Sequence, residues 1–153
     1  MKFYLASRFG RRSELQGYRS KLIELGHEVT SRWLTVEHKA EDTDQPEQPS
    51  DAHERFALDD LEDIDKSDAL VAFTESPDST YGRGGRHVEL GYALAMAGSF
   101  AIMQRRLQVI VVGPRENVFT HLSAVHHYPD AAGFMAFAQG LNIVERHYGR
   151  RLH

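Results

Sequence analysis

The chain has 153 residues, 41% of them hydrophobic and 26% charged, which is typical of one globular domain with a buried core. Its formal net charge of −4 argues against long nucleic acid or an anionic membrane surface as a partner. The absence of cysteine excludes disulfides, thiolate metal ligands and a cysteine nucleophile, and it suits a reducing compartment.

Hydrophobic periodicity predicts strands that alternate with helices along the chain. The segment 35–52 is acidic, contains proline and shows no period, so we expect a surface loop or a lid there. In chain order the pattern predicts a strand at 3–6, a polar turn at 7–12, a helix that stops at Gly26, a strand at 27–33, the acidic loop, a helix at 53–67, a strand at 69–74, a glycine-rich loop at 75–85, a helix at 87–106 with a candidate break at Gly98, a strand at 109–112 and a helix at 130–146.

Several of the predicted strands are apolar throughout, as at 69–74 and 109–112. Such strands are buried on both faces, which is typical of a parallel sheet covered by helices. We therefore expect a single α/β domain over 1–153, a Rossmann- or flavodoxin-like three-layer sandwich with a mostly parallel five-stranded sheet. Ligands of such sheets bind beyond the carboxyl ends of the strands, where the polar segments 7–12 and 74–87 are expected to lie.

The first of these polar segments is a basic turn between a strand and a helix. It reads Ser7, Arg8, Phe9, Gly10, Arg11 and Arg12. Backbone N–H groups at a helix start and arginine side chains are what a phosphate group requires. The P-loop and dinucleotide-binding glycine patterns are both absent. The turn therefore predicts an anion site, and the alternative is a solvated basic surface.

A glycine-rich stretch that begins inside the second polar segment, 82–95, delivers a carboxylate to the start of a helix. Its glycines, Gly85 among them, allow the backbone to approach a ligand closely, and Glu89 is expected in the first helical turn. The helix dipole would keep that carboxylate ionised. An ionised carboxylate at a crevice can attack an anomeric carbon. The alternative is that Glu89 only caps its helix.

Three blocks in order resemble the nucleoside 2-deoxyribosyltransferase superfamily, which includes the 2′-deoxynucleoside 5′-phosphate N-hydrolases. The blocks are 3–7, 60–71 and 89–93. The resemblance implies a retaining reaction, in which Glu89 attacks C1′ and forms a glycosyl-enzyme. It places Asp60 as the second catalytic acid, which assists departure of the base, and Tyr4 beside the sugar and the nucleophile. Without the resemblance, Asp60 would be a solvated helix residue and Tyr4 a core aromatic.

The basic turn resembles the phosphate turn of the monophosphate hydrolases, which favours that branch. The segment 122–124 resembles one whose serine, here Ser123, reaches the phosphate in a neighbouring subunit, so a homodimer with shared active sites is implied. The alternative for Ser123 is a helix or turn cap. The hydrolases have a serine six residues before the nucleophile, where this chain has Arg83. Arg83 or Arg86 is then a candidate for that phosphate contact.

Together, the motifs and the resemblance predict cleavage of a (deoxy)nucleoside 5′-monophosphate to free base and sugar phosphate. The alternatives are base exchange between nucleosides by a deoxyribosyltransferase and a catalytically silent nucleotide-binding or sensing module. Trp33 is either a core residue or an aromatic wall against the base. No metal or other cofactor is expected, because the nine histidines show no HExxH pattern and the reaction needs none. No apolar run is long enough for a secretion signal or a membrane span, so we expect a cytoplasmic protein.

Overall fold

The structure is a computed structural model that describes residues 1–35, 50–76, 84–98 and 107–148. Over these residues, one sheet holds the strands in the order β2-β1-β3-β4-β5, and every neighbouring pair is parallel. The predicted α/β class and five-stranded sheet are confirmed, and the sheet is wholly parallel. The strands are β1 (Lys2–Ala6), β2 (Glu28–Val29), β3 (Ala69–Phe73), β4 (Gln108–Val112) and β5 (Val125–Tyr128).

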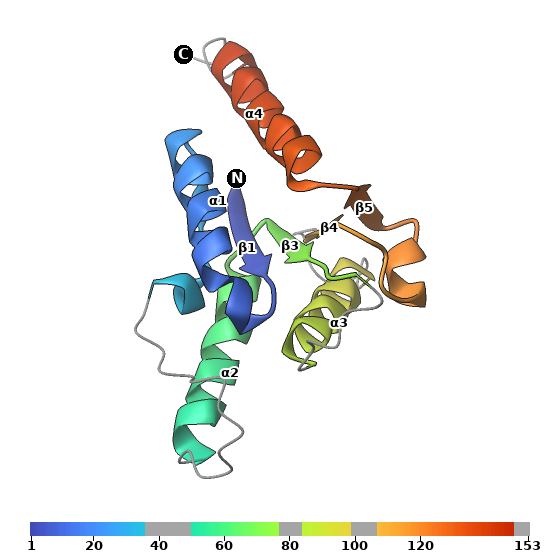
Figure 1. Cartoon of the computed structure of the whole chain (residues 1–153). Coiled ribbons are helices and arrows are strands. Elements are labelled where there is room, and N and C mark those ends of the chain that lie inside the picture. Colours follow the sequence, from blue (N-terminus) through green and yellow to red (C-terminus); the bar gives the residue numbers. More distant parts are fainter. Residues whose placement is uncertain (36–49, 77–83, 99–106, 149–153) are drawn as a thin grey trace.

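Helices cover both faces of this sheet, as Figure 1 shows. On one side lie α1 (Arg12–Glu24) and α4 (Ala131–Tyr148), and on the other α2 (Ser50–Asp65) and α3 (Gly85–Gly98). Parallel strands require such crossovers, because a short hairpin cannot join them. The described residues include no helix long and apolar enough to cross a bilayer.

Successive side chains of β1 point to opposite faces of the sheet, Phe3 toward α4 and Tyr4 toward α3. Phe3 packs edge-on against Phe134 of α4, with ring centroids 5.8 Å apart. On β3, Phe73 stacks on Tyr18 of α1 at 5.1 Å. Successive strand residues point to opposite faces, so Tyr4 faces the α2 and α3 side. One strand thus carries both a core aromatic and a functional candidate.

The second strand is much shorter than the predicted 27–33. β2 spans Glu28–Val29 only, and the chain then turns into the 3₁₀ helix η2 (Arg32–Leu34). The reason is that side chains take over the pairing with β1. The Leu5 N–H donates to the Ser31 hydroxyl oxygen at 2.6 Å, and the Trp33 indole N–H donates to the Leu5 carbonyl at 2.9 Å.

Other boundaries differ by a few residues. α2 begins at Ser50, inside the predicted loop 35–52, and positions 36–49 of that loop lie outside the described residues. α3 begins at Gly85 and ends at Gly98, the predicted break point, while 99–106 lie outside the described residues. β5 has no counterpart among the predicted strands, because its sequence Val-His-His-Tyr is neither apolar throughout nor clearly alternating.

The strand order creates one place where the chain leaves neighbouring strands in opposite directions. After β1 the chain passes to β2 at the sheet edge, and after β3 it passes to β4 on the other side. Such a switch point leaves a crevice beyond the carboxyl ends of the two strands, and ligands bind there in open α/β sheets. The predicted basic turn follows β1 at this point.

Candidate active site

A tyrosine and a glutamate meet on the α3 side of the sheet. The Tyr4 hydroxyl donates a hydrogen bond of 2.6 Å to Glu89 Oε1. Tyr4 is fully buried in β1, and Glu89 is half-buried in α3. Because α3 begins at Gly85, Glu89 lies in the second helical turn and not in the first, where we expected it. It does not cap the helix.

Burial governs the acidity of Glu89. It raises the pKa of this carboxyl from 4.5 to about 7, and the negative charge of Asp60 adds to the rise. The hydrogen bond from Tyr4 and the positive charge of Arg86 oppose it. The expectation that the helix dipole keeps Glu89 fully ionised at neutral pH is therefore wrong. Loss of hydration raises the pKa of Glu89 by more than Tyr4 and Arg86 lower it.

Asp60 is the third member of this group. It comes from α2, and burial raises its pKa from 3.8 to about 6, against a hydrogen bond with Tyr4 that lowers it. The pKa of Tyr4 itself is raised, first by burial and then by the charges of Glu89 and Asp60. The structure thus brings together the three residues that the resemblance implied to be catalytic. Two carboxyl groups that titrate near neutrality and both interact with one hydroxyl suit acid–base and nucleophilic chemistry.

An arginine that sequence reasoning missed fixes the helix that carries Asp60. Arg32 of η2 contacts Asp63 Oδ1 at 2.7 Å, Asp59 Oδ1 at 3.1 Å and Glu62 Oε2 at 2.5 Å. The Arg32 backbone N–H also donates to Asp63 Oδ2 at 2.8 Å. The signal in the sequence was the spacing of the acids, since positions 59, 62 and 63 share one face of a helix. No pattern indicated which cation would meet them.

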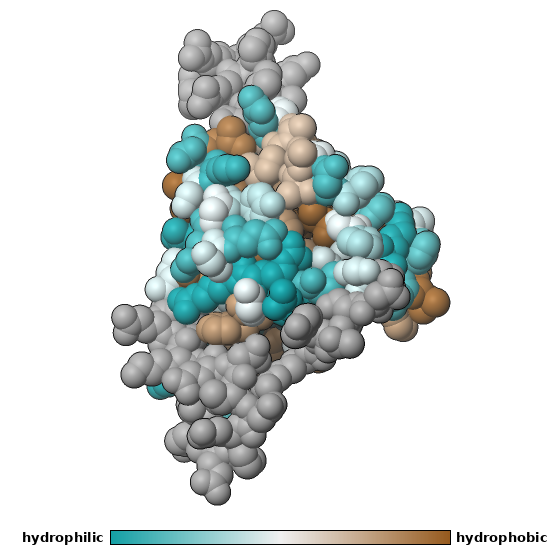
Figure 2. Space-filling view, viewed as in Figure 1, coloured by the Kyte–Doolittle hydropathy of each residue, from teal (hydrophilic) through white to brown (hydrophobic). Residues whose placement is uncertain are grey.

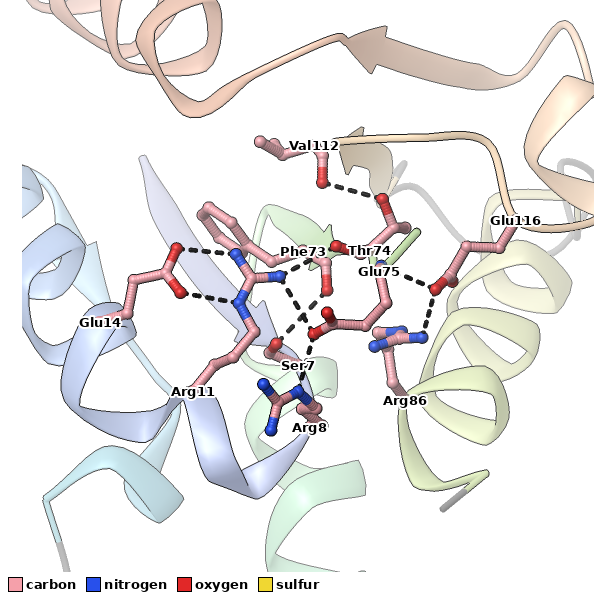
Figure 3. A network of polar contacts seen from close by, with 10 residues as sticks. All are labelled: Ser7, Arg8, Arg11, Glu14, Phe73, Thr74, Glu75, Arg86, Val112 and Glu116. Carbon is pink, nitrogen blue, oxygen red and sulfur yellow. Dashed lines mark hydrogen bonds and ion pairs between the residues drawn. The ribbon is translucent and has the colours of Figure 1, made fainter. Parts of the chain in front are cut away.

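The basic turn after β1 meets a carboxylate that the sequence did not single out (Figure 3). Glu75, two residues beyond β3, accepts from Arg8 Nε at 3.0 Å and from Arg11 Nη1 at 3.4 Å. Arg11 also forms two bonds of 2.7 Å to Glu14 and one of 2.9 Å to the Thr74 carbonyl. The basic turn is therefore built into the ends of β1 and β3 and is not a solvated surface.

The remaining members of the turn pack rather than point outward. The Ser7 hydroxyl donates to the Phe73 carbonyl at 3.3 Å. The Arg12 guanidinium lies over the Phe9 ring at 5.6 Å, and that ring packs against Trp33 at 6.4 Å. A Cβ at Gly10 would clash with Arg8 Nη1, so glycine allows this arginine to fold back across the turn.

A second pairing links the glycine-rich region to the end of β4. Arg86 Nη2 contacts Glu116 Oε1 at 2.6 Å, and only 7% and 11% of these two side chains are exposed. The same oxygen accepts the Glu75 N–H at 2.7 Å. Glu116 was not singled out in the sequence, because a lone acid in a loop has no distinguishing pattern. Buried pairs of this kind hold backbone segments in register.

The remaining predicted contact residues are Trp33, Gly85, Arg83 and Ser123. Trp33 is buried, and its indole N–H is bonded to β1, so it belongs to the core. Gly85 begins α3 and is exposed, and Arg83 lies outside the described residues. Ser123 is exposed just before β5, two strands away from β3. Within the described parts of the chain, no three histidine or acidic side chains are grouped so that they could hold a metal ion.

Comparison with known proteins identifies the fold. No protein-family model and no curated protein sequence matches the chain. Among solved structures it is similar to a 2-deoxyribosyltransferase from Bacillus psychrosaccharolyticus, with a TM-score of 0.58 and 18% identity over 88% of this chain and 90% of that chain. A CMP N-glycosidase from Clostridium botulinum matches with a TM-score of 0.49 and 17% identity over 90% and 97% of the two chains. At this identity, the likeness to the transferase shows a shared flavodoxin-like fold.

Proposed function

We propose that the chain is an enzyme that cleaves the N-glycosidic bond of a (deoxy)nucleoside 5′-monophosphate, with Glu89 as nucleophile. The observation that carries the proposal is the contact of Tyr4 with two half-buried carboxyl groups from different helices, Glu89 and Asp60. Titratable groups with raised pKa values that cluster in this way are typical of active sites. The similarity of fold to a 2-deoxyribosyltransferase supports the same bond as the target.

The reaction proceeds in two displacements. One Glu89 oxygen attacks C1′ of the sugar, the C1′–N bond breaks, and the electron pair leaves with the base, which receives the Asp60 proton. A water molecule then attacks C1′, gives its proton to Asp60, and returns Glu89 as a carboxylate. The products are free base and sugar phosphate, with net retention at C1′. Tyr4 holds Oε1 by its hydrogen bond and leaves the other oxygen for attack.

The two pKa values suit these roles near neutral pH. Asp60, with a pKa of about 6, can hold a proton for the base and release it in the same cycle. Glu89, with a pKa of about 7, must be ionised to attack while Asp60 still holds its proton, so the rate should be highest between about pH 6 and 7 and fall on either side. Burial makes the carboxylate a stronger nucleophile than a solvated one, because less hydration has to be lost in the attack.

The basic turn is the proposed site of the 5′-phosphate. Ser7, Arg8, Arg11 and Arg12 surround the switch point, and the start of α1 adds backbone N–H groups. The pairing of Arg8 and Arg11 with Glu75 favours a second candidate function. A deoxyribosyltransferase that exchanges bases between neutral nucleosides would bind no phosphate there. Its acceptor base would replace water in the second displacement.

The protein is also proposed to act as a homodimer with Ser123 of each subunit near the partner's site. Three apolar side chains beside Ser123 are exposed, Val118 by 77%, Phe119 by 61% and Leu122 by 47%. Figure 2 shows brown side chains at the right-hand edge, where η3 (Val118–His121) lies in Figure 1. Exposed apolar patches of this kind often mark interfaces. Light scattering of wild type and of Phe119→Glu tests this, and a wild-type monomer would refute it.

The experiment for the main proposal is a substrate panel. Purified protein is mixed with each nucleoside and each 5′-monophosphate, with and without a second base, and free base is measured by chromatography. We expect base release from a monophosphate and none with Glu89→Gln. Mass spectrometry of quenched wild type should show a sugar-phosphate adduct at Glu89. Glu54→Gln, which removes an exposed acid of α2, serves as the control.

Two outcomes would contradict the proposal. Release of base by Glu89→Gln at a tenth of the wild-type rate or more would refute the nucleophile, because loss of a covalent catalyst should lower the rate by orders of magnitude. Base release only from nucleosides, and only when a second base is present, would replace hydrolysis by transfer.

A further inference from the structure

We propose that Glu75 competes with the substrate phosphate for Arg8 and Arg11, and that it thereby sets the preference between a nucleoside and its 5′-monophosphate. The inference rests on the proposed function, because it takes the basic turn to be the place of the 5′ end of the substrate. It goes beyond that function by naming a residue that opposes phosphate binding.

Glu75 already occupies both arginines of the basic turn. A single oxygen of Glu75, Oε1, lies 3.0 Å from Arg8 Nε and 3.4 Å from Arg11 Nη1. Figure 3 shows the Glu75 side chain pointing toward both arginines. The Glu75 side chain is only 17% exposed, so the interaction is less screened than a surface ion pair. The carboxylate thus offers these guanidinium groups the same kind of oxygen acceptor that a phosphate would offer.

Arg8 and Arg11 differ in how firmly the fold holds them. Arg11 is held on three sides, by Glu14, by the Thr74 carbonyl and by Glu75, and it is 18% exposed. Arg8 is 34% exposed, and its Nε bonds to Glu75. We therefore expect Arg8 to exchange Glu75 for a phosphate oxygen, while Arg11 stays in place as a fixed positive charge.

The exchange of Glu75 for a phosphate oxygen needs only a side-chain rotation of Glu75. Its backbone N–H is bound to Glu116 at 2.7 Å, and Glu116 is held by Arg86 at 2.6 Å. The main chain at Glu75 is thus fixed from the β4 side, and only the side chain faces the basic turn. Rotation would carry the carboxylate away from Arg8 without moving the end of β3.

The consequence is a selective effect on affinity. A monophosphate carries close to two negative charges near neutral pH and must displace or tolerate the Glu75 charge. A nucleoside has a neutral 5′-hydroxyl and meets no such competition. A repulsive group that acts against one ligand and not the other is a specificity element.

Isothermal titration calorimetry with ribose 5-phosphate and with inorganic phosphate tests the inference. Glu75→Gln keeps the shape of the side chain and removes its charge, and we expect it to bind ribose 5-phosphate about tenfold to a hundredfold more tightly than wild type. Glu24→Gln removes one exposed acid of α1 and gives the same change in net charge. This control should bind like wild type. Unchanged or weaker binding by Glu75→Gln would overturn the inference.

The design separates this inference from the proposed function and from a folding defect. Binding of ribose 5-phosphate needs no turnover, so tighter binding by a protein that cleaves nothing would support Glu75 and refute cleavage. A protein that cleaves nucleotides, but whose Glu75→Gln variant binds ribose 5-phosphate no more tightly than wild type, would support cleavage and refute the role of Glu75. Circular dichroism checks the fold of the variant. If Glu75→Gln fails to fold, Glu75→Ser gives the same test, with the same gain expected and the same results contradicting it.

Discussion

Replacing Glu89 by glutamine should make the protein inactive and, above neutral pH, more stable than wild type. The carboxyl group of Glu89 is withdrawn from water by the fold, which raises its pKa from 4.5 to about 7. Between these values the folded chain binds a proton that the unfolded chain has lost. Stability linked to this group is therefore present below about pH 4.5 and is lost as the pH rises through about 7.

The size of the effect follows from that rise. Each tenfold change in an ionisation constant corresponds to about 1.4 kcal/mol. A rise from 4.5 to about 7 thus makes ionised Glu89 lower the free energy of unfolding by about 3 kcal/mol. Glutamine carries no charge at any pH, and its side-chain oxygen can still accept the hydrogen bond from Tyr4. The variant should avoid the whole loss.

Urea unfolding at a fixed protein concentration measures the difference, followed by circular dichroism at several pH values. We expect the free energy of unfolding of Glu89→Gln to exceed that of wild type by about 3 kcal/mol at about pH 8 and to approach it at about pH 4. Glu54→Gln, an exposed change on α2, should follow wild type throughout. A variant that is no more stable than wild type at the higher pH would refute burial as the cause of the raised pKa.

Three further changes test the neighbours of the nucleophile. Tyr4→Phe removes a hydrogen bond that favours the ionised nucleophile, so the pKa of Glu89 should rise and the maximal rate in a pH–rate profile, between about pH 6 and 7, should fall about tenfold to a hundredfold. Asp60→Asn should lower kcat by about a hundredfold or more in steady-state assays with little change in KM, whereas Asp59→Asn should lower it far less. Arg86→Met should destabilise the protein by about 3–5 kcal/mol in urea unfolding, because the Glu116 carboxylate loses its counter-charge, and adding Glu116→Gln to Arg86→Met should recover most of this loss.

The architecture could be predicted from the sequence because apolar runs and helical periods report burial directly. The runs at 69–74 and 109–112 match β3 and β4, and their composition predicted a parallel sheet. β2 and β5 were harder for a physical reason. Both are edge strands, where side chains such as Ser31 replace backbone pairing or where one face is exposed. Neither condition leaves a strong hydrophobic pattern.

The site was only partly accessible from sequence. The resemblance named Tyr4, Asp60 and Glu89, and the structure brings these side chains together. The carboxylates that pair with the basic turn were missed, because Glu75 meets Arg8 only when the ends of β1 and β3 lie side by side. The balance of forces on Glu89 was also missed, since burial of a helical residue depends on tertiary packing that no local pattern reports.

The short second strand affects how copies of the chain can associate. β2 lies at one edge of the sheet and is only two residues long before the chain coils into η2. A long exposed edge would present a row of unpaired backbone groups, on which another chain could build an intermolecular sheet. At this edge only Glu28 and Val29 form a strand, because Ser31 and Trp33 bind β1 through their side chains while the chain turns into η2. The side chains that end the strand therefore also shorten the edge on which another chain could pair.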